Sequence, residues 1–307
     1  MNQQSHEKLS SLVIVLLNYC SADDTISNVK HLLSFNRPYH IVVVDNSSPD
    51  GSYTKLKSFF KDSNQVDILR TGANLGYAAG NNYGIRYAAK CYDIETIAVI
   101  NPDVTIPSSE IIEKLCTLLY SDEKCIFAGG CPLNHCNNDE PMPMGWDIPS
   151  ASEIFLNSSL FAGSPDEKHQ QRCIQIKDGI YRVECIAGCF FVAKYSLFKK
   201  IGFFDEGTFL YNEENILGIK AREAGYYGLV DSKLNYYHNH TVKKEPVMLK
   251  NKLTSIDVGF KSRVYLAQTY YSKFVLPLLY LTHILNKFFL LLAWLKHKFI
   301  ASTDRMK

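Results

Sequence analysis

The sequence predicts an α/β fold whose central sheet is mostly parallel and flanked by helices. Short apolar runs rich in β-branched residues alternate with segments of helical periodicity. The first run, 11–17 (SLVIVLL), is followed by a helical pattern over 23–33, for which Asp23 or Asp24 could act as N-cap, and then by a second run over 41–44. This strand–helix–strand order is typical of a Rossmann-like parallel sheet.

Further elements continue the alternation. We expect a helix from about Ser52, a strand over 66–69, a helix over 108–119 and a strand over 126–130. The stretch 131–177 is rich in Pro, Asn and Ser and has weak periodicity, which is typical of a long excursion over a ligand-binding edge.

Three glycines spaced four residues apart, Gly76, Gly80 and Gly84, predict an unusual helix. On a helix they share one face and let it approach another backbone closely. Each glycine costs roughly 1 kcal/mol relative to alanine in a helix interior, so a packing or ligand reason is expected. The spacing does not match GxGxxG, which counts against a dinucleotide oxidoreductase.

The segment 97–104, IAVINPDV, reads as a buried strand that ends in a proline-stiffened turn. Asp103 then lies just past the carboxyl end of that strand, at the edge where open α/β sheets bind ligands. A carboxylate there suits Mg²⁺ or Mn²⁺ bridging two phosphates. A solvated Asp in a turn is the alternative.

Asp45 closes the second strand, where a Rossmann-like unit presents an acid to a ribose or base. Alternatively, the polar cluster that begins at Asp45 caps the helix near Ser52, and both roles can coexist. Asn74 lies beside the glycine-spaced helix and adds an amide to its beginning.

The second half begins with a predicted strand over 181–193, interrupted by Gly188, and a short helix over 194–200. A helix over 216–224 begins behind Glu213 and Glu214 and ends at Gly225. A last strand is expected over 226–230, and His238 and His240 follow after a short excursion. Taken alone, the two acids have a simple explanation, because carboxylates stabilise a helix N-terminus.

Composition narrows the class of protein. The chain has 307 residues, 46% of them hydrophobic, and a net charge of +2, so a strongly polyanionic partner such as nucleic acid is not expected. Its nine cysteines lack CxxC spacing, and residues 1–10 are polar without the apolar core of a signal peptide. We therefore expect a cytosolic protein with reduced thiols.

Five stretches in order resemble family 2 glycosyltransferases of the inverting GT-A class: LVIVLLNY, IVVVDNSSPDGS, NLGYAAGNNYGI, AVINPDV, and the segment from AGCFFVA to REAGY with the later YYHNHT. The resemblance covers 11–241 and implies a GT-A fold. The pair NLGYAAGNNYG and INPDV is similar to the branch of rhamnosyl- and galactosyltransferases of surface polysaccharide synthesis, such as O-antigen and capsule.

The resemblance implies site roles. Asp45 would hold the nucleotide base with Asn18 beside it, while Asn74 and the helix carrying Gly76 and Gly80 would shape the nucleotide pocket. Asn101 and Asp103 would stand at the DxD-type motif, with Asn101 replacing its first acid. Asp103 and His238, or alternatively His240, would bind Mg²⁺ or Mn²⁺. Glu214 would be the base, and Glu213 would support it or bind the acceptor.

The resemblance also implies a function: inverting transfer of a single sugar from a nucleotide-diphosphate sugar, dTDP-rhamnose or a UDP-hexose, to a lipid-linked or growing saccharide. The alternatives are a non-catalytic relative that kept the fold, and a nucleotidyltransferase. The latter should show a glycine-rich basic loop after the first strand, where this chain has LLNYCSADD.

The C-terminal segment 242–307 is basic and apolar. Its run 274–294 is long enough to span a bilayer but contains His283, Asn286 and Lys287, and lysines flank it at positions 273, 296 and 298. We expect helices lying on the cytoplasmic face of the inner membrane; an amphipathic pair packed on the domain or in a dimer is the alternative. The predicted division is 1–10, 11–241 and 242–307.

Overall fold

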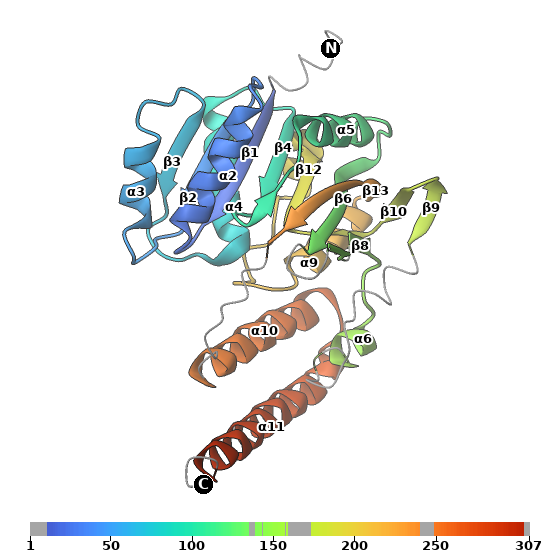
Figure 1. Cartoon of the computed structure of the whole chain (residues 1–307). Coiled ribbons are helices and arrows are strands. Elements are labelled where there is room, and N and C mark those ends of the chain that lie inside the picture. Colours follow the sequence, from blue (N-terminus) through green and yellow to red (C-terminus); the bar gives the residue numbers. More distant parts are fainter. Residues whose placement is uncertain are drawn as a thin grey trace.

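The computed structural model describes residues 11–134, 139–142, 144–156, 158, 173–239 and 249–303, the last seven of these as backbone. A twisted sheet with helices on both faces forms the body of the molecule, and two long helices lie along one end of it (Figure 1). The predicted α/β class with a mostly parallel sheet is confirmed.

The sheet begins with four parallel strands in the order β3–β2–β1–β4 and continues through β12, β6, β13, β10 and β9. β12 is antiparallel to both of its neighbours, and β6 and β13 run parallel to each other. The strands are β1 (Leu12–Asn18), β2 (His40–Asp45), β3 (Val66–Arg70), β4 (Thr96–Ile100), β6 (Cys125–Asn134), β9 (Ile174–Lys177), β10 (Ile180–Val183), β12 (Phe190–Lys194) and β13 (Tyr227–His238).

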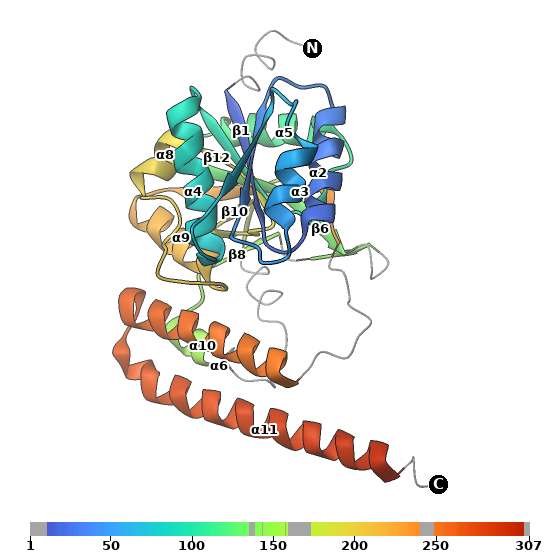
Figure 2. The same ribbon diagram turned by 90° about the vertical axis from the view of Figure 1, so that its left-hand side faces the viewer.

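Successive side chains of each strand point to opposite faces of the sheet, so the strands contribute to two apolar cores. In β1, Leu12, Ile14 and Leu16 enter one apolar cluster, while Val13 and Val15 enter the other. The first cluster lies under α2 (Ala22–Ser34), α3 (Ser52–Phe59) and α5 (Ser109–Leu119), and the second under α4 (Gly76–Cys91), α8 (Tyr195–Lys200) and α9 (Glu213–Glu223). Figure 2 shows the two sets of helices on opposite sides of the sheet.

The glycine face of α4 packs against the sheet, as the spacing predicts. A Cβ on Gly84 would lie 2.8 Å from side-chain atoms of Val15 and Val44, and one on Gly80 would lie 2.5 Å from Leu17. Such distances are too short for carbon atoms in contact, so only glycine lets α4 lie this close to β1 and β2.

The prediction of one strand over 181–193 is wrong. The chain forms β10, then β11 (Cys185–Ile186), which pairs with β8 (Gly145–Trp146) in a separate small sheet, and returns to the large sheet as β12. The apolar run conceals this switch because Val183, β11 and β12 are all buried, although the strands belong to different ladders. Gly188 lies in the connection between β11 and β12.

Other boundaries also differ. β4 ends at Ile100, and Val104 belongs to β5 (Val104–Thr105), which pairs with β13. β13 continues from Tyr227 to His238, so no excursion separates the last strand from that histidine. The N-cap of α2 is Ser21, whose hydroxyl donates to Asp24 at 2.7 Å, and not Asp23 or Asp24.

Two long helices follow the domain: α10 (Leu249–Tyr270) and α11 (Leu276–Thr303), joined by the short 3-10 turn Lys273–Val275. α10 lies between α11 and the sheet domain, and α11 is the outermost element in both views (Figures 1 and 2). The remaining described elements, β7 (Glu140–Pro141) and α6 (Ala151–Leu156), lie in the predicted excursion.

Candidate active site

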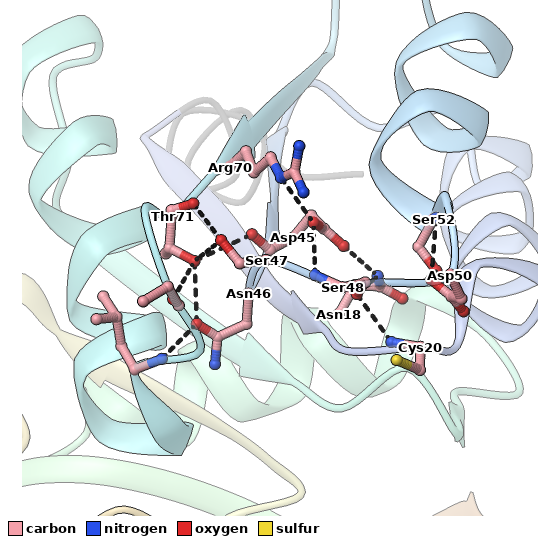
Figure 3. A network of polar contacts seen from close by, with 12 residues as sticks. Asn18, Cys20, Asp45, Asn46, Ser47, Ser48, Asp50, Ser52, Arg70 and Thr71 are labelled. Carbon is pink, nitrogen blue, oxygen red and sulfur yellow. Dashed lines mark hydrogen bonds and ion pairs between the residues drawn. The ribbon is translucent and has the colours of Figure 1, made fainter.

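The polar ends of three neighbouring strands meet in register. Asn18 pairs with Asp45 across β1 and β2, and Asp45 pairs with Arg70 across β2 and β3. The Asn18 side chain donates to Asp45 Oδ1 at 2.9 Å, the Ser48 amide donates to Oδ2 at 3.1 Å, and Arg70 Nε lies 3.7 Å from Oδ2 (Figure 3). Asp45 is fully buried, so its carboxylate fixes the loops that follow β1 and β2.

Asn46 is a second organiser of this edge, and the sequence analysis gave it no role. Its Nδ2 donates to Asn74 Oδ1 at 3.0 Å and to Gly76 O at 3.1 Å, and its Oδ1 accepts from the Leu75 amide at 3.0 Å. Thr71 also donates to Asn46 Oδ1, at 3.1 Å (Figure 3). The end of β2 is therefore joined to the beginning of α4, with Asn74 and Gly76 in the junction.

A pocket of about 460 Å³ lies between the loops after β1 and β2 and is lined by residues that include Asp23, Asp24 and Asp50. Lys55, also in the lining, forms an ion pair with Asp23 at 2.5 Å. Three carboxylates and one paired lysine disfavour a diphosphate.

Gly76 links the cluster around Asp45 and Asn46 to the loop before α9. It has φ +80, and a Cβ there would lie 2.2 Å from the carbonyl oxygen of Phe209. The next amide, that of Tyr77, donates to the same oxygen at 2.8 Å. Glycine is required both by the left-handed backbone and by this close approach.

Gly76→Ala is expected to destabilise the fold by about 2–4 kcal/mol, of which the left-handed conformation accounts for roughly 1–2 and the clash with Phe209 for the remainder. Urea denaturation followed by circular dichroism measures the change. Gly72→Ala in the same loop is the matched control, because nothing lies within 4 Å of a Cβ there. Equal midpoints for the two variants would contradict this account of Gly76.

Asp103 and His238 face each other across β5 and β13. His238 is in register with Val104, the Asn239 amide donates to the Asp103 carbonyl at 2.8 Å, and His238 Nε2 lies 3.4 Å from Asp103 Oδ1. Burial disfavours the imidazolium, but hydrogen bonds to Asp103 and Cys189 outweigh it and raise the pKa of His238 to about 10.

The donor set fits a divalent cation. A carboxylate oxygen and an imidazole nitrogen are ligands of Mn²⁺ and Mg²⁺. Among the described residues, no group of three or more His, Cys, Asp or Glu side chains could hold a metal. A cation held by Asp103 and His238 would therefore need phosphate and water oxygens to complete its coordination. His240, the alternative ligand, lies outside the described residues.

Asn101 contributes to this turn through its backbone. Its amide donates to Cys189 O at 2.8 Å, and its carbonyl accepts from Asn28 Nδ2 at 3.1 Å and from the Val104 amide at 3.1 Å. The NPD turn is therefore held from α2 on one side and from the start of β12 on the other.

Two acids begin α9, behind a strained segment. Tyr211 and Asn212 both have positive φ, 75° and 68°, which non-glycine residues rarely adopt. Glu213 is 5% exposed, and its Oε1 makes no hydrogen bond within the described residues. Burial, and secondarily the charge of Glu214, raises the pKa of Glu213 to about 8.

Glu214 is more exposed and lies against Gly188. A Cβ on Gly188 would lie 2.5 Å from Glu214 Oε1, so this glycine leaves room for the carboxylate. The Tyr77 hydroxyl donates to Gly188 O at 2.6 Å, and burial followed by the charges of Glu214 and Glu213 raises the pKa of Tyr77. The sequence analysis treated Gly188 only as a break in a strand.

These contacts join the predicted residues into one edge. Gly76 and Tyr77 connect the Asn18–Asp45–Asn74 cluster to Gly188 and Glu214. Cys189, the neighbour of Gly188, contacts both Asn101 and His238. A chain of contacts thus runs along this edge from Asp45 to Glu214 and His238, while Glu213 precedes Glu214 at the start of α9 and Gly80 packs against Leu17.

α10 covers the loop before the acids. Ser262 Oγ donates to Leu210 O at 2.7 Å, Tyr265 donates to Asp205 at 2.8 Å, and Tyr270 donates to the same carboxylate. Arg263 lies near Tyr211, and burial lowers its pKa. The C-terminal segment therefore contributes to the wall of the candidate site.

Polar side chains gather at the carboxyl edge of a mostly parallel sheet, which is where α/β proteins with this architecture bind their ligands. The chain belongs to glycosyl transferase family 2, whose sequence model matches residues 11–200. The predicted family and the predicted enzyme class are thereby confirmed.

The relatives are sugar transferases. The chain is 29% identical over 221 residues to the low-salt glycan biosynthesis hexosyltransferase Agl10 of Haloferax volcanii, covering 70% of this chain and 62% of that relative. It is 25% identical over 226 residues to the N-acetylglucosaminyl-diphospho-decaprenol L-rhamnosyltransferase of Mycobacterium tuberculosis, covering 70% of this chain and 71% of that one.

A solved structure shares the fold. The mannosyltransferase PcManGT of Pyrobaculum calidifontis, in complex with GDP-Man and Mn²⁺, superposes with a TM-score of 0.57 at 12% identity, covering 88% of this chain and 68% of that one. The predicted GT-A fold agrees with this likeness.

Proposed function

We propose that the chain transfers one sugar, with inversion, from a nucleotide-diphosphate sugar to a saccharide acceptor in surface glycan biosynthesis. The observation that carries this proposal is the meeting of three groups at one sheet edge: the cluster around Asp45, the Asp103–His238 pair and the acids Glu213 and Glu214. Residues 11–241 would form the transferase domain.

The donor would lie along this edge. Its base and ribose would lie over the cluster formed by Asn18, Asp45 and Asn74, beside the start of α4 at Gly76 and the close packing at Gly80. Asp45 is fully buried and bonded to Asn18 and the Ser48 amide, so it would hold the base through the loop residues that it positions. The names of the relatives, a hexosyltransferase and an L-rhamnosyltransferase, favour a hexose or L-rhamnose as the transferred sugar, which a UDP-hexose or dTDP-rhamnose donor would supply.

Asp103 and His238 would hold Mg²⁺ or Mn²⁺ at the NPD turn, next to Asn101. When bound, the cation would neutralise the negative charge of the leaving diphosphate. Mn²⁺ accompanies the nucleotide sugar in the PcManGT complex, which supports a divalent cation here. His238 would have to give up its proton to act as a ligand.

Glu214 would accept the proton of the acceptor hydroxyl. The pKa of Glu213, raised to about 8, keeps that carboxyl protonated at neutral pH, which suits a hydrogen-bond donor to the acceptor better than a base. Glu214 is more exposed than Glu213 and lies beside Gly188, which is in the connection between β11 and β12.

The acceptor would be a lipid-linked or growing saccharide, handled at the cytoplasmic face of the inner membrane. The name of the mycobacterial relative contains a decaprenol-linked sugar, and the described residues include one helix, Lys273–Lys296, that is long and apolar enough to cross a membrane. Family membership favours sugar transfer over the nucleotidyltransferase alternative.

Calorimetric titration with UDP, dTDP, GDP and CDP, each with and without Mn²⁺, tests the proposal. We expect one diphosphate to bind at least about tenfold more tightly in the presence of Mn²⁺, which corresponds to 1.4 kcal/mol. Binding of dTDP would favour rhamnose, and binding of UDP a hexose. If none of the four binds, the chain is a non-catalytic member of the family.

A further inference from the structure

The polar side chains in the middle of α11 all face the protein. His283 Nε2 lies 3.1 Å from Asp257 Oδ1 of α10, and Lys287 Nζ lies 2.5 Å from the same atom. The ring of His283 stacks on Phe260 with centroids 3.9 Å apart. The two titratable residues that interrupt the apolar sequence, His283 and Lys287, are thus both paired with Asp257 of α10.

The two uncharged polar residues of this part of α11, Thr282 and Asn286, are hydrogen-bonded to Ser158. Asn286 Nδ2 donates to Ser158 O at 2.6 Å, and Thr282 shares a hydrogen bond of 2.8 Å with Ser158 Oγ. Leu279 completes this side of the helix and is 1% exposed. Positions 279, 282, 283 and 286 follow helical spacing, so α11 has one stripe that faces the protein.

The rest of the helix surface is apolar and exposed. The large apolar side chains opposite the stripe are exposed: Leu281, Ile284, Leu285, Phe288, Leu291, Leu292 and Leu295, which we call the outer face of α11. A contiguous apolar surface of this extent marks a binding site for a protein or a membrane.

The charges around the outer face are basic, which favours a membrane over a second copy of the chain as the partner. Lys273 and Lys296 are exposed at its two ends, and no acid occurs between Asp257 and Asp304. A second copy of the same basic surface would be repelled, whereas anionic lipid would be attracted.

We propose that α11 lies in the plane of an anionic membrane surface, with its outer face inserted and its polar stripe turned towards α10. This inference deepens the proposed function, since it specifies how the enzyme would meet a lipid-linked acceptor. α11 does not cross the bilayer, because α10 packs along it and carries the exposed lysines Lys252 and Lys261, which crossing would bring into the hydrocarbon (Figures 1 and 2).

The same arrangement fixes the candidate site relative to the membrane. α10 contacts the inserted helix on one side and holds Leu210 and Asp205 on the other through Ser262 and Tyr265. The loop that begins α9 therefore lies one helix layer away from the lipid. Saccharide attached to a lipid at that surface would emerge next to Glu213 and Glu214.

Co-sedimentation of the full chain with vesicles tests docking without any assay of sugar transfer. We expect binding to vesicles of phosphatidylcholine with 30% phosphatidylglycerol, weaker binding to pure phosphatidylcholine, and loss with rising salt. Ile284→Glu should weaken binding at least about tenfold. Ile174→Glu is the matched control, because Ile284 and Ile174 are 63% and 64% exposed and Ile174 lies on β9.

Three outcomes would overturn the proposal: equal vesicle binding by both variants, absence of vesicle binding with a dimer in sedimentation that Ile284→Glu dissolves, and protection of a C-terminal tag from protease outside sealed vesicles. The last would show that α11 crosses the bilayer. In-plane docking predicts instead that the tag stays cleavable and that brominated lipids quench the fluorescence of a Phe288→Trp variant more strongly than that of the unmodified chain, because Phe288 lies on the outer face and is 53% exposed. Failure of the proposed function would leave these results unchanged.

Discussion

Glu214→Gln is expected to lower kcat by about 10²–10⁴-fold while the Kd of the nucleotide diphosphate stays unchanged. The amide has the shape of the carboxylate and can keep the contact beside Gly188, but it cannot accept the acceptor proton. Single-turnover kinetics with saturating donor and calorimetry of the diphosphate measure the two quantities separately.

Two variants of the same helix sharpen this test. Glu213→Gln keeps a neutral side chain that can donate a hydrogen bond, as the protonated Glu213 does at neutral pH, so we expect a smaller loss that appears mainly in the KM of the acceptor. Glu223→Gln, exposed at the far end of α9, should behave as the unmodified enzyme. A larger loss of kcat in Glu213→Gln than in Glu214→Gln would exchange the roles of the two acids.

The parallel half of the fold could be predicted from sequence because its signals are local. Each buried strand ends at the residue where apolar side chains give way to polar ones, as at Asn18 and Asp45. Parallel strands in register then place such ends side by side, which is why these two residues meet. The position of Asp103, just beyond the end of β4, could be predicted in the same way.

Residues whose importance depends on tertiary contacts could not be predicted in this way. Asn46 looks like any turn residue, yet it holds the start of α4, and Gly188 looks like a weak point in a strand, yet it leaves room for Glu214. Burial of residues 185–194 concealed the switch of ladder between β10 and β12, because apolar content reports burial and not the identity of the neighbouring strand.

The orientation of the C-terminal segment could not be predicted from sequence for the same reason. Sequence alone left open whether Asn286 and Lys287 would lie in lipid or against protein, since a side chain's direction on an apolar helix depends on what packs beside it. Asp257 and Ser158 supply the partners, from α10 and from the residue that follows α6 at position 158. The polar interruptions of α11 therefore mark its protein-facing stripe.

Asp103→Asn is expected to abolish the effect of Mn²⁺ on nucleotide diphosphate affinity and to lower kcat/KM by about 10²–10³-fold. Only Asp103 and His238 are available at this turn in the described structure, so a neutral amide at position 103 removes the one anionic ligand of a site that already depends on the diphosphate. Calorimetry with and without Mn²⁺ measures the coupling between cation and nucleotide directly.

Asn101→Asp supplies the converse test at the same turn. Asn101 takes the place of the first acid in the DxD-type motif, and its backbone bonds to Cys189 and Asn28 do not depend on the side chain. An added carboxylate should therefore leave the turn intact and tighten Mn²⁺-dependent binding, because anionic oxygen is the preferred ligand of this cation. If Asp103→Asn keeps the full Mn²⁺ dependence and Asn101→Asp does not increase it, the cation binds elsewhere and the Asp103–His238 pair is structural.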